Sequence, residues 1–259
     1  MKLFSSYLAI VLLTTAQFVT ANDVPIVAAA SDLQFALPEI AADFEAQTGH
    51  RVRLNFGSSG NFRRQITQGA PFELYLSADE DYVFALQHDG HTRDDGCLYA
   101  IGRIVIITPK NNTALVDEQL IQLGKKLARQ ELNRFAIANP AHAPYGVAAK
   151  QALEAKGLWT AIQPQLVLGE NVSQAAQYAL SGNTDGGIVA YSLALAPALR
   201  ERAVFALIPA ELHAPLRQRM VLMKDAGVVA EKFYAFLQTE PARVVLERYG
   251  FALPEEQQD

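Results

Sequence analysis

The chain has 259 residues, of which half are hydrophobic and 19% are charged, and its formal net charge is −5. This length suggests one or two domains, and the hydrophobic share is enough for a large packed core. The low content of charge argues against a disordered chain, and the acidic balance offers no basic surface for nucleic acid, polyphosphate or an anionic membrane.

The first 21 residues have the layout of a secretory signal peptide. Lys2 gives a positive start, residues 8–13 are apolar, and Val19-Thr20-Ala21 offers a cleavage site of small residues. Polar residues interrupt the apolar stretch too early for a membrane span of about 20 residues. We therefore expect residues 1–21 to be removed and the protein to work in a bacterial periplasm. Cys97 is the single cysteine, so neither an internal disulfide nor a cysteine cluster for a metal is expected.

Strand and helix patterns alternate along the first 90 residues of the secreted chain. Strands are predicted where apolar residues are continuous or alternate with polar ones, and helices where they recur at helical spacing. The predicted strands are 24–30, 52–56 and 72–77, and the predicted helices are 33–47, 62–68 and 79–87. Three strand-turn-helix units in a row predict a parallel sheet with helices on its faces.

The alternation restarts after a β-branched strand predicted over residues 101–108. Extended segments are predicted at 135–138, 166–168, 187–190 and 216–223, and helices at 115–128, 147–156, 172–180, 192–199, 228–238 and 241–249. The halves share no sequence repeat and no flexible linker separates them. We predict an α/β protein with two lobes and a ligand cleft at the carboxyl ends of the strands.

Four strand-to-helix turns stand out because they are rich in small residues or hydroxyl groups. They are residues 28–31, 57–60, 143–146 and 170–173. Each turn places backbone N–H groups at the start of a helix, where they lack partners and carry the positive end of the helix dipole. Four such turns meeting in one cleft could bind a small oxyanion without an arginine.

Two acidic residues within these turns oppose anion binding. A carboxylate of Asp32 or Glu170 beside a bound anion would repel it. We expect both side chains to face away from the cleft, with Asp32 capping the following helix.

Signals of catalysis are weak. Common motifs of zinc proteases, serine hydrolases and nucleotide-binding loops are missing from the sequence, and we expect the protein not to be an enzyme. One alternative remains open, an exported hydrolase that uses Ser31 or Ser59 together with His142. His88 and His91 could bind a metal opportunistically, but a solvated loop is the simpler reading.

Several short segments follow one another in an order and spacing that is specific as a set. They are Ala29-Ala30-Ser31, Gly57-Ser58-Ser59-Gly60, Arg64-Gln65-Ile66, Gly69-Ala70-Pro71, Ser77-Ala78-Asp79, Asn139-Pro140, Ala143-Pro144-Tyr145-Gly146, Gly187-Ile188-Val189 and Arg248-Tyr249-Gly250-Phe251. By these segments nearly the whole secreted chain resembles the periplasmic molybdate/tungstate-binding proteins of ABC transporters.

The resemblance implies a type II periplasmic-binding-protein fold, with a mainly parallel sheet flanked by helices in each lobe. Residues 22–102 and 209–259 would form lobe I and residues 103–208 lobe II. The implied ligand is molybdate or tungstate, held by neutral donors without a further cofactor. The implied partner is an ABC permease in the membrane, and we expect the receptor to be a monomer that binds no nucleic acid.

The resemblance also implies the residues that hold the oxyanion. Ser31 and Ser59 would offer hydroxyl and backbone N–H groups from lobe I, and Tyr145 and Val172 would offer backbone N–H groups from lobe II. Some relatives place a tyrosine directly after the Gly-Ile-Val segment, whereas this chain has Ala190 there and Tyr191 one residue later. One step along a strand reverses the side-chain direction, so Tyr191 is not expected to replace that contact.

The sequence indicates a tetrahedral oxyanion as the ligand but does not decide which one. Sulfate has the same charge and shape as molybdate but is smaller, and sequence does not report cavity size. Phosphate keeps a proton part of the time and would benefit from an acceptor, so it fits neutral donors less well. The preference between molybdate and tungstate is also left open.

Overall fold

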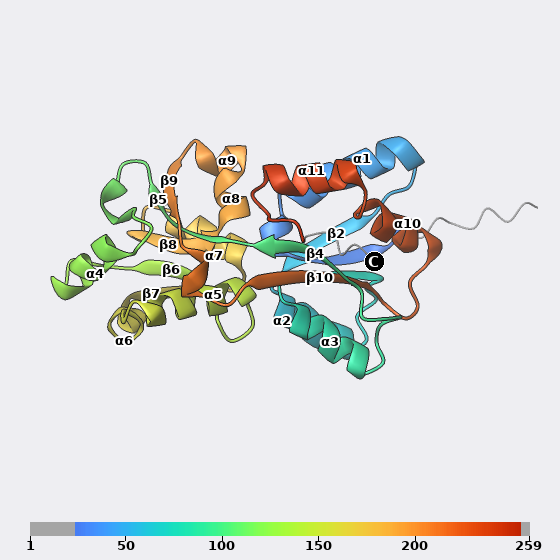
Figure 1. Cartoon of the computed structure of the whole chain (residues 1–259), viewed down its shortest axis with the longest axis horizontal. Coiled ribbons are helices and arrows are strands. Elements are labelled where there is room, and N and C mark those ends of the chain that lie inside the picture. Colours follow the sequence, from blue (N-terminus) through green and yellow to red (C-terminus); the bar gives the residue numbers. More distant parts are fainter. Residues whose placement is uncertain (1–23, 255–259) are drawn as a thin grey trace, which may run out of the picture.

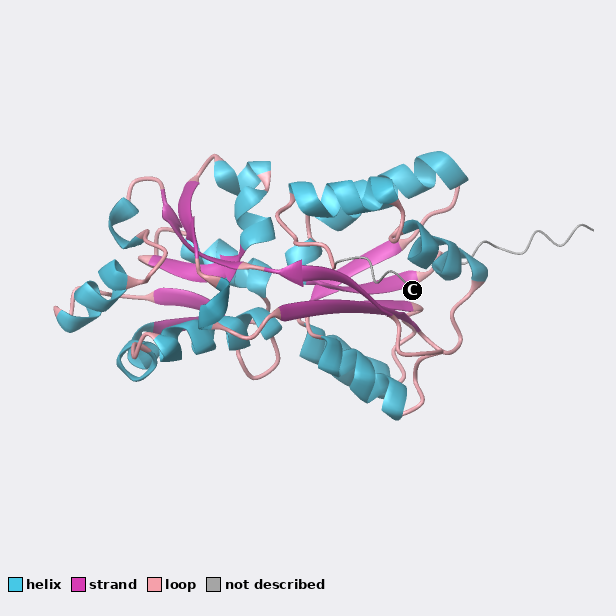
Figure 2. Cartoon of the chain, viewed as in Figure 1, coloured by secondary structure: helices cyan, strands magenta, loops and turns pink. Residues whose placement is uncertain are grey.

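The computed structural model describes residues 24–254, so the predicted signal peptide lies outside the described residues. Two five-stranded sheets, each flanked by helices, lie one after the other along the long axis of the molecule (Figures 1 and 2). The predicted two-lobed α/β fold is therefore confirmed. No helix within residues 24–254 is long and apolar enough to cross a membrane.

The first sheet has the strand order β2-β1-β3-β10-β4. Its strands are β1 (Ile26–Ala30), β2 (Arg53–Gly57), β3 (Leu74–Ser77), β4 (Cys97–Gly102) and β10 (Leu216–Leu222). The helices that flank it are η1 (Ser31–Leu33), α1 (Ala36–Thr48), α2 (Ser59–Thr67), α3 (Glu80–His88), α10 (Val228–Phe236) and α11 (Glu240–Arg248). Helices α1, α10 and α11 lie on one side of the sheet and α2 and α3 on the other (Figure 1).

The second sheet has the strand order β7-β6-β8-β5-β9. Its strands are β5 (Ile104–Pro109), β6 (Phe135–Ala138), β7 (Leu166–Gly169), β8 (Gly186–Ala190) and β9 (Ala203–Leu207). The helices are η2 (Thr113–Leu115), α4 (Ile121–Ala128), α5 (Pro144–Ala155), α6 (Trp159–Ile162), η3 (Gln163–Gln165), α7 (Val172–Ala179), α8 (Tyr191–Leu195), α9 (Pro197–Arg200) and η4 (Ala210–Leu212).

Both sheets are mixed, but four of the five strands in each run in the same direction, so the sheets are mainly parallel as expected. β1 pairs in parallel with β2 and β3, and β6 with β7 and β8, whereas β10 and β5 each run antiparallel to both of their neighbours. The antiparallel strands lie where the chain passes between the lobes, since β4 ends at Gly102 and β5 begins at Ile104. The parallel half of each sheet is the half that supplies the four turns.

The sequence patterns were wrong at several places, and one of them is the helix predicted over 192–199, which is two helices, α8 and α9. The strand predicted over 101–108 is two strands, β4 and β5, because it crosses from one sheet to the other at Arg103. The helix predicted over 115–128 begins only at Ile121, since the Asp117 carboxylate accepts the backbone N–H groups of Ile121 and Gln122 and starts the helix there. Strand β9, an edge strand, was not predicted.

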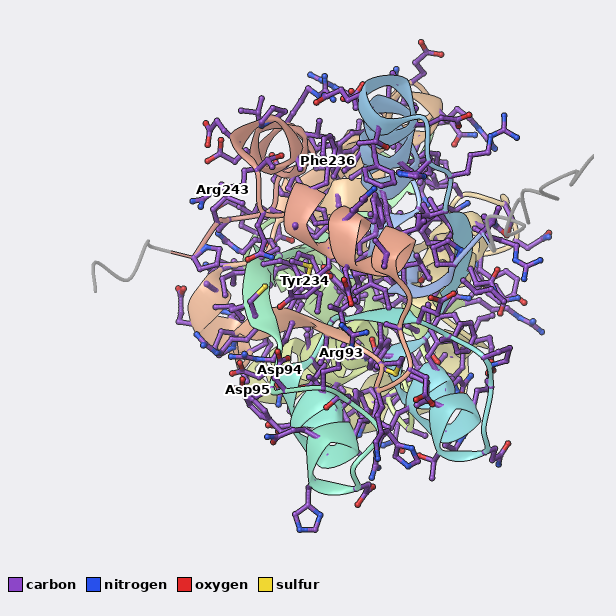
Figure 3. All side chains as sticks on the ribbon, turned by 90° about the vertical axis from the view of Figure 1, so that its right-hand side faces the viewer. Arg93, Asp94, Asp95, Tyr234, Phe236 and Arg243 are labelled. Atoms are coloured by element: carbon purple, nitrogen blue, oxygen red, sulfur yellow. The ribbon has the colours of Figure 1, made fainter. Side chains whose placement is uncertain are left out.

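The far end of the first lobe is closed by α10 (Figure 3). Arg93 reaches this helix, where it pairs with Glu231 and donates to the carbonyl oxygen of Ala226. On the inner side of the helix the Phe236 ring lies 5.5 Å from the Phe44 ring, centroid to centroid. Cys97 is half-buried and forms no disulfide, its thiol contacts the Tyr234 hydroxyl, and burial raises the pKa of the thiol. The side chains at this end of the lobe are therefore packed against α10. A raised pKa disfavours the reactive thiolate form of Cys97.

Candidate functional site

One small cavity lies where all four predicted turns meet between the lobes. Its lining includes Ser31, Ser59, Tyr145 and Val172, the four residues that the resemblance implies as donors to the oxyanion. Their exposure is at most 3%, so the closed lobes cover them. The structure thus brings the four predicted residues together in one enclosed place.

Strand register explains why the turns converge. Each turn follows the carboxyl end of a parallel strand, namely β1, β2, β6 and β7. Ala30 lies opposite Gly57 in the first sheet, and Ala138 lies opposite Gly169 in the second. The turns after these strands therefore start at one edge of each sheet, and the two edges face each other across the cleft.

The hydroxyl oxygens of Ser31 and Ser59 each already accept a hydrogen bond from a backbone N–H group. Ser59 Oγ accepts the backbone N–H of Ala78 at 3.0 Å, and Ser31 Oγ accepts the backbone N–H of Ser173 at 3.3 Å. Each hydroxyl keeps its hydrogen for another acceptor. The Tyr75 hydroxyl also donates to the carbonyl oxygen of Ser59 at 2.8 Å, which fixes the start of α2.

Tyr145 and Val172 contribute through their positions in helices. Tyr145 follows Pro144 in the first turn of α5, and Val172 is the first residue of α7. N–H groups at these positions have no acceptor within the helix. The capping side chain of Asn171 accepts the N–H of Gln174 at 3.0 Å and leaves that of Val172 free for a ligand.

The lobes are closed on each other beside the cavity. The N–H of Gly60 donates to the carbonyl oxygen of His142 at 3.0 Å, and Ser58 Oγ lies 2.9 Å from His142 Nδ1. His142 Nε2 lies 3.6 Å from Oε2 of Glu170, and the other oxygen of this carboxylate, Oε1, accepts from the Asn61 amide. The contacts of Ser58, Gly60 and Asn61 join the start of α2 in the first lobe to the loops before α5 and α7 of the second, so these three exist only when the cleft is shut. The contact of His142 with Glu170 lies within the second lobe.

The alternative of an exported hydrolase would need His142 to pair with Ser31 or Ser59, and the structure shows a different pairing. His142 pairs with Ser58, whereas Ser31 and Ser59 accept backbone N–H groups elsewhere. The structure thus gives His142 a place in the contact between the lobes. Within residues 24–254 no group of three or more His, Cys, Asp or Glu side chains is arranged to hold a metal ion.

The expectation that both acidic side chains face away from the cleft was wrong for Asp32 and only partly right for Glu170. The Glu170 side chain is 61% exposed and does not line the cavity, but it accepts a hydrogen bond from Asn61 across the cleft. Asp32 is 1% exposed, lines the cavity and caps no helix. Its Oδ2 accepts the Tyr145 hydroxyl at 2.9 Å and the Gln218 amide at 2.6 Å. Sequence reasoning missed this link because Tyr145 and Gln218 lie far from Asp32 along the chain.

Tyr191 does not reach the cavity. Its ring packs against Phe205, with 5.9 Å between ring centroids, and lies so close over Gly250 that a Cβ there would come within 2.6 Å of it. The next residue, Ser192, instead donates its hydroxyl to the carbonyl oxygen of Asp32 at 2.8 Å. Tyr191 therefore does not replace the tyrosine contact that is missing at Ala190.

The cavity can favour a bound anion although no cationic side chain among the described residues lines it. Among residues 24–254, no Lys, Arg or His lines it. Positive potential comes from serine hydroxyl groups and from N–H groups at helix starts. The one carboxyl group in the wall is Asp32, and burial raises its pKa to about 6 because desolvation disfavours the charged form.

Comparison with known proteins gives consistent matches. The family model described as bacterial extracellular solute-binding protein matches residues 26–252. The chain is 35% identical to the molybdate-binding protein ModA of Rhodobacter capsulatus over 87% of either chain, and 35% identical to that of Azotobacter vinelandii over 88% of this chain and 89% of the relative. The solved periplasmic molybdate-binding protein of A. vinelandii superimposes with a TM-score of 0.80 at 32% identity, covering 90% of this chain and all of that one.

Proposed function

Because the chain belongs to the family of bacterial extracellular solute-binding proteins, we propose that it is a receptor that binds molybdate or tungstate between its two lobes. The observation that carries this proposal is the enclosed cavity in which Ser31, Ser59, Tyr145 and Val172 come together without a cationic side chain. The identity of 35% to molybdate-binding proteins over most of the chain supports the choice of ligand.

Neutral donors suit this ligand because molybdate and tungstate carry no proton at neutral pH. Each oxygen can then accept from a hydroxyl or an N–H group without needing an acceptor in return. Each such bond to a charged ligand contributes about 1.5–3 kcal/mol net. Ser31 and Ser59 supply donors from the first lobe and Tyr145 and Val172 from the second, so a bound anion would hold the cleft shut.

We propose that the closed receptor delivers its anion to an ABC permease from the periplasm. A receptor of this kind presents both lobes to its transporter, and we therefore propose that it acts as a monomer. The role is one of binding and release, and no catalytic step is needed for it. Sulfate or another tetrahedral oxyanion is the alternative ligand, distinguished from molybdate by size.

Thermal unfolding of the purified protein with each candidate anion tests the proposal. A ligand that binds only the folded protein adds about 4 kcal/mol to the free energy of unfolding at a thousandfold excess over its Kd. We expect molybdate and tungstate to raise the unfolding temperature strongly, and sulfate, phosphate and chromate to leave it nearly unchanged. An equal shift with sulfate would point to a general oxyanion carrier, and no shift with any of the anions would contradict the proposal.

A further inference from the structure

Asp32 is a carboxyl group in the wall of an anion site, which ordinary electrostatics disfavours. Its side chain is 1% exposed and lines the cavity together with Ser31. Oδ2 accepts two hydrogen bonds, from the Tyr145 hydroxyl and the Gln218 amide. Oδ1 is buried and has no hydrogen-bond partner of good geometry among the described residues, although the backbone N–H groups of Asp32 and Leu33 lie near the carboxyl and partly offset the cost of its charge. A buried oxygen without a partner is costly, and it is more costly still as part of a charged group.

No counter-ion relieves this cost. The titratable groups that face Asp32 are the hydroxyls of Tyr145 on α5 and Tyr99 on β4. β10 contributes the neutral Gln218, which joins the two tyrosines by accepting from Tyr99 at 2.7 Å, and α8 contributes the Ser192 hydroxyl, which donates to the backbone carbonyl of Asp32. Within the described part of the chain no Lys, Arg or His contacts the carboxyl group.

We propose that the protein takes up one proton on the Asp32 carboxyl when it closes on its dianion. This inference rests on the proposed function. The proton comes from solvent, and the neutral carboxylic acid no longer repels the anion. It also turns one carboxyl oxygen from an acceptor into an O–H donor, which matches a ligand that can only accept. Asp32 is therefore a specificity residue, since an ionised carboxylate in its place would favour an anion that brings its own proton.

Closure of the lobes is the step that buries the Asp32 carboxyl group and raises its pKa. Asp32 and Gln218 belong to the first lobe, whereas Tyr145 and Ser192 belong to the second. In an open cleft the carboxyl would face water and keep its ordinary pKa near 3.9. Closure buries it and raises its pKa to about 6, and a dianion beside it raises the pKa further.

The direction of the pH effect follows from this shift. Because the pKa is raised in the closed, bound state, binding takes up a proton in the range between the two pKa values. Affinity for a dianion is then highest at low pH and falls as the pH rises from the pKa of the open state to that of the bound state. The expected loss is about tenfold per pH unit in this range, and the affinity levels off above the pKa of the bound state, where neither state holds the proton.

Calorimetric titration with molybdate at pH 6, in buffers that differ in their enthalpy of ionisation, measures the proton directly. Molybdate is a dianion at this pH. We expect the wild-type protein to take up about half a proton or more per anion bound. Asp32→Asn keeps an acceptor for Tyr145 and Gln218 but cannot titrate, so it is expected to take up none and to bind with an affinity that does not depend on pH. An infrared difference spectrum of the wild-type protein should gain the carbonyl band of a protonated carboxylic acid when molybdate is added.

Two matched variants separate Asp32 from the other titratable groups at the contact between the lobes. His142→Gln and Glu170→Gln change the contact at the rim of the cleft and are expected to retain the proton uptake. Molybdate binding without proton uptake and without the infrared band would overturn the inference while leaving the receptor intact. Loss of the uptake in His142→Gln, or its persistence in Asp32→Asn, would also overturn it. A wild-type protein that binds no molybdate would instead refute the proposed function.

Discussion

Replacing Ser59 with alanine is expected to weaken molybdate binding about 10- to 100-fold. The serine hydroxyl is fully buried, and its oxygen is held by the N–H of Ala78, so its hydrogen is available to the anion. Removing one donor to a charged ligand costs about 1.5–3 kcal/mol, which corresponds to that loss of affinity. Equilibrium titration with molybdate measures it.

Ser181→Ala is the matched control for this prediction. Ser181 is exposed after the end of α7, where its hydroxyl donates to a carbonyl oxygen of the same helix. The same atom is thus removed from a serine outside the cavity, and affinity should stay unchanged. An equal affinity for molybdate in Ser59→Ala and Ser181→Ala would mean that Ser59 is not a ligand residue.

Replacing Gly60 with alanine is expected to hinder closure of the lobes and to lower molybdate affinity about tenfold or more. A Cβ at this position would lie 2.7 Å from the carbonyl oxygen of His142, which is backbone of the opposite lobe, and 3.0 Å from the Tyr82 hydroxyl. Overpacking of this kind costs about 1–3 kcal/mol. The residue lies in the first turn of α2, where alanine suits the helix, so the clash arises from closure more than from folding.

The control for Gly60→Ala is Gly124→Ala. Gly124 lies in α4, and a Cβ there would approach only the Leu158 side chain, at 3.3 Å. Both variants put alanine into a helix, but only Gly60→Ala affects the cleft. Thermal unfolding without ligand should show both proteins folded, and molybdate titration should separate them. Wild-type affinity in Gly60→Ala would contradict the closed arrangement of the lobes.

The four turns could be predicted from sequence because their signals are local. A strand, a short run of small or hydroxyl residues and a helix start are all visible within about ten residues. The carboxyl ends of parallel strands meet at one edge of a sheet. The turns after β1 and β2 therefore lie side by side in the first lobe, and those after β6 and β7 lie side by side in the second. This reasoning predicts that the four turns meet in one cleft, and the resemblance to a known family adds the particular residues Ser31, Ser59, Tyr145 and Val172.

The parts that could not be predicted depend on contacts between distant segments. Asp32 looked like a helix cap because Ser and Asp near a helix start usually act as caps. Its real partners are Tyr145 and Gln218, which lie 113 and 186 residues away along the chain. The pairing of Ser58 with His142 across the cleft is of the same kind. The split between β4 and β5 was missed because an apolar run shows no sign of which sheet it joins.

The position of a bound molybdate tests the central claim most directly. Molybdenum scatters anomalously, so crystals of the protein grown with molybdate reveal the metal atom of the anion without any assumption about its site. The account predicts one strong anomalous peak in the cavity between the lobes, within reach of the Ser31 and Ser59 hydroxyls and of the N–H groups of Tyr145 and Val172. A peak elsewhere on the molecule, or none in crystals saturated with molybdate, would contradict it.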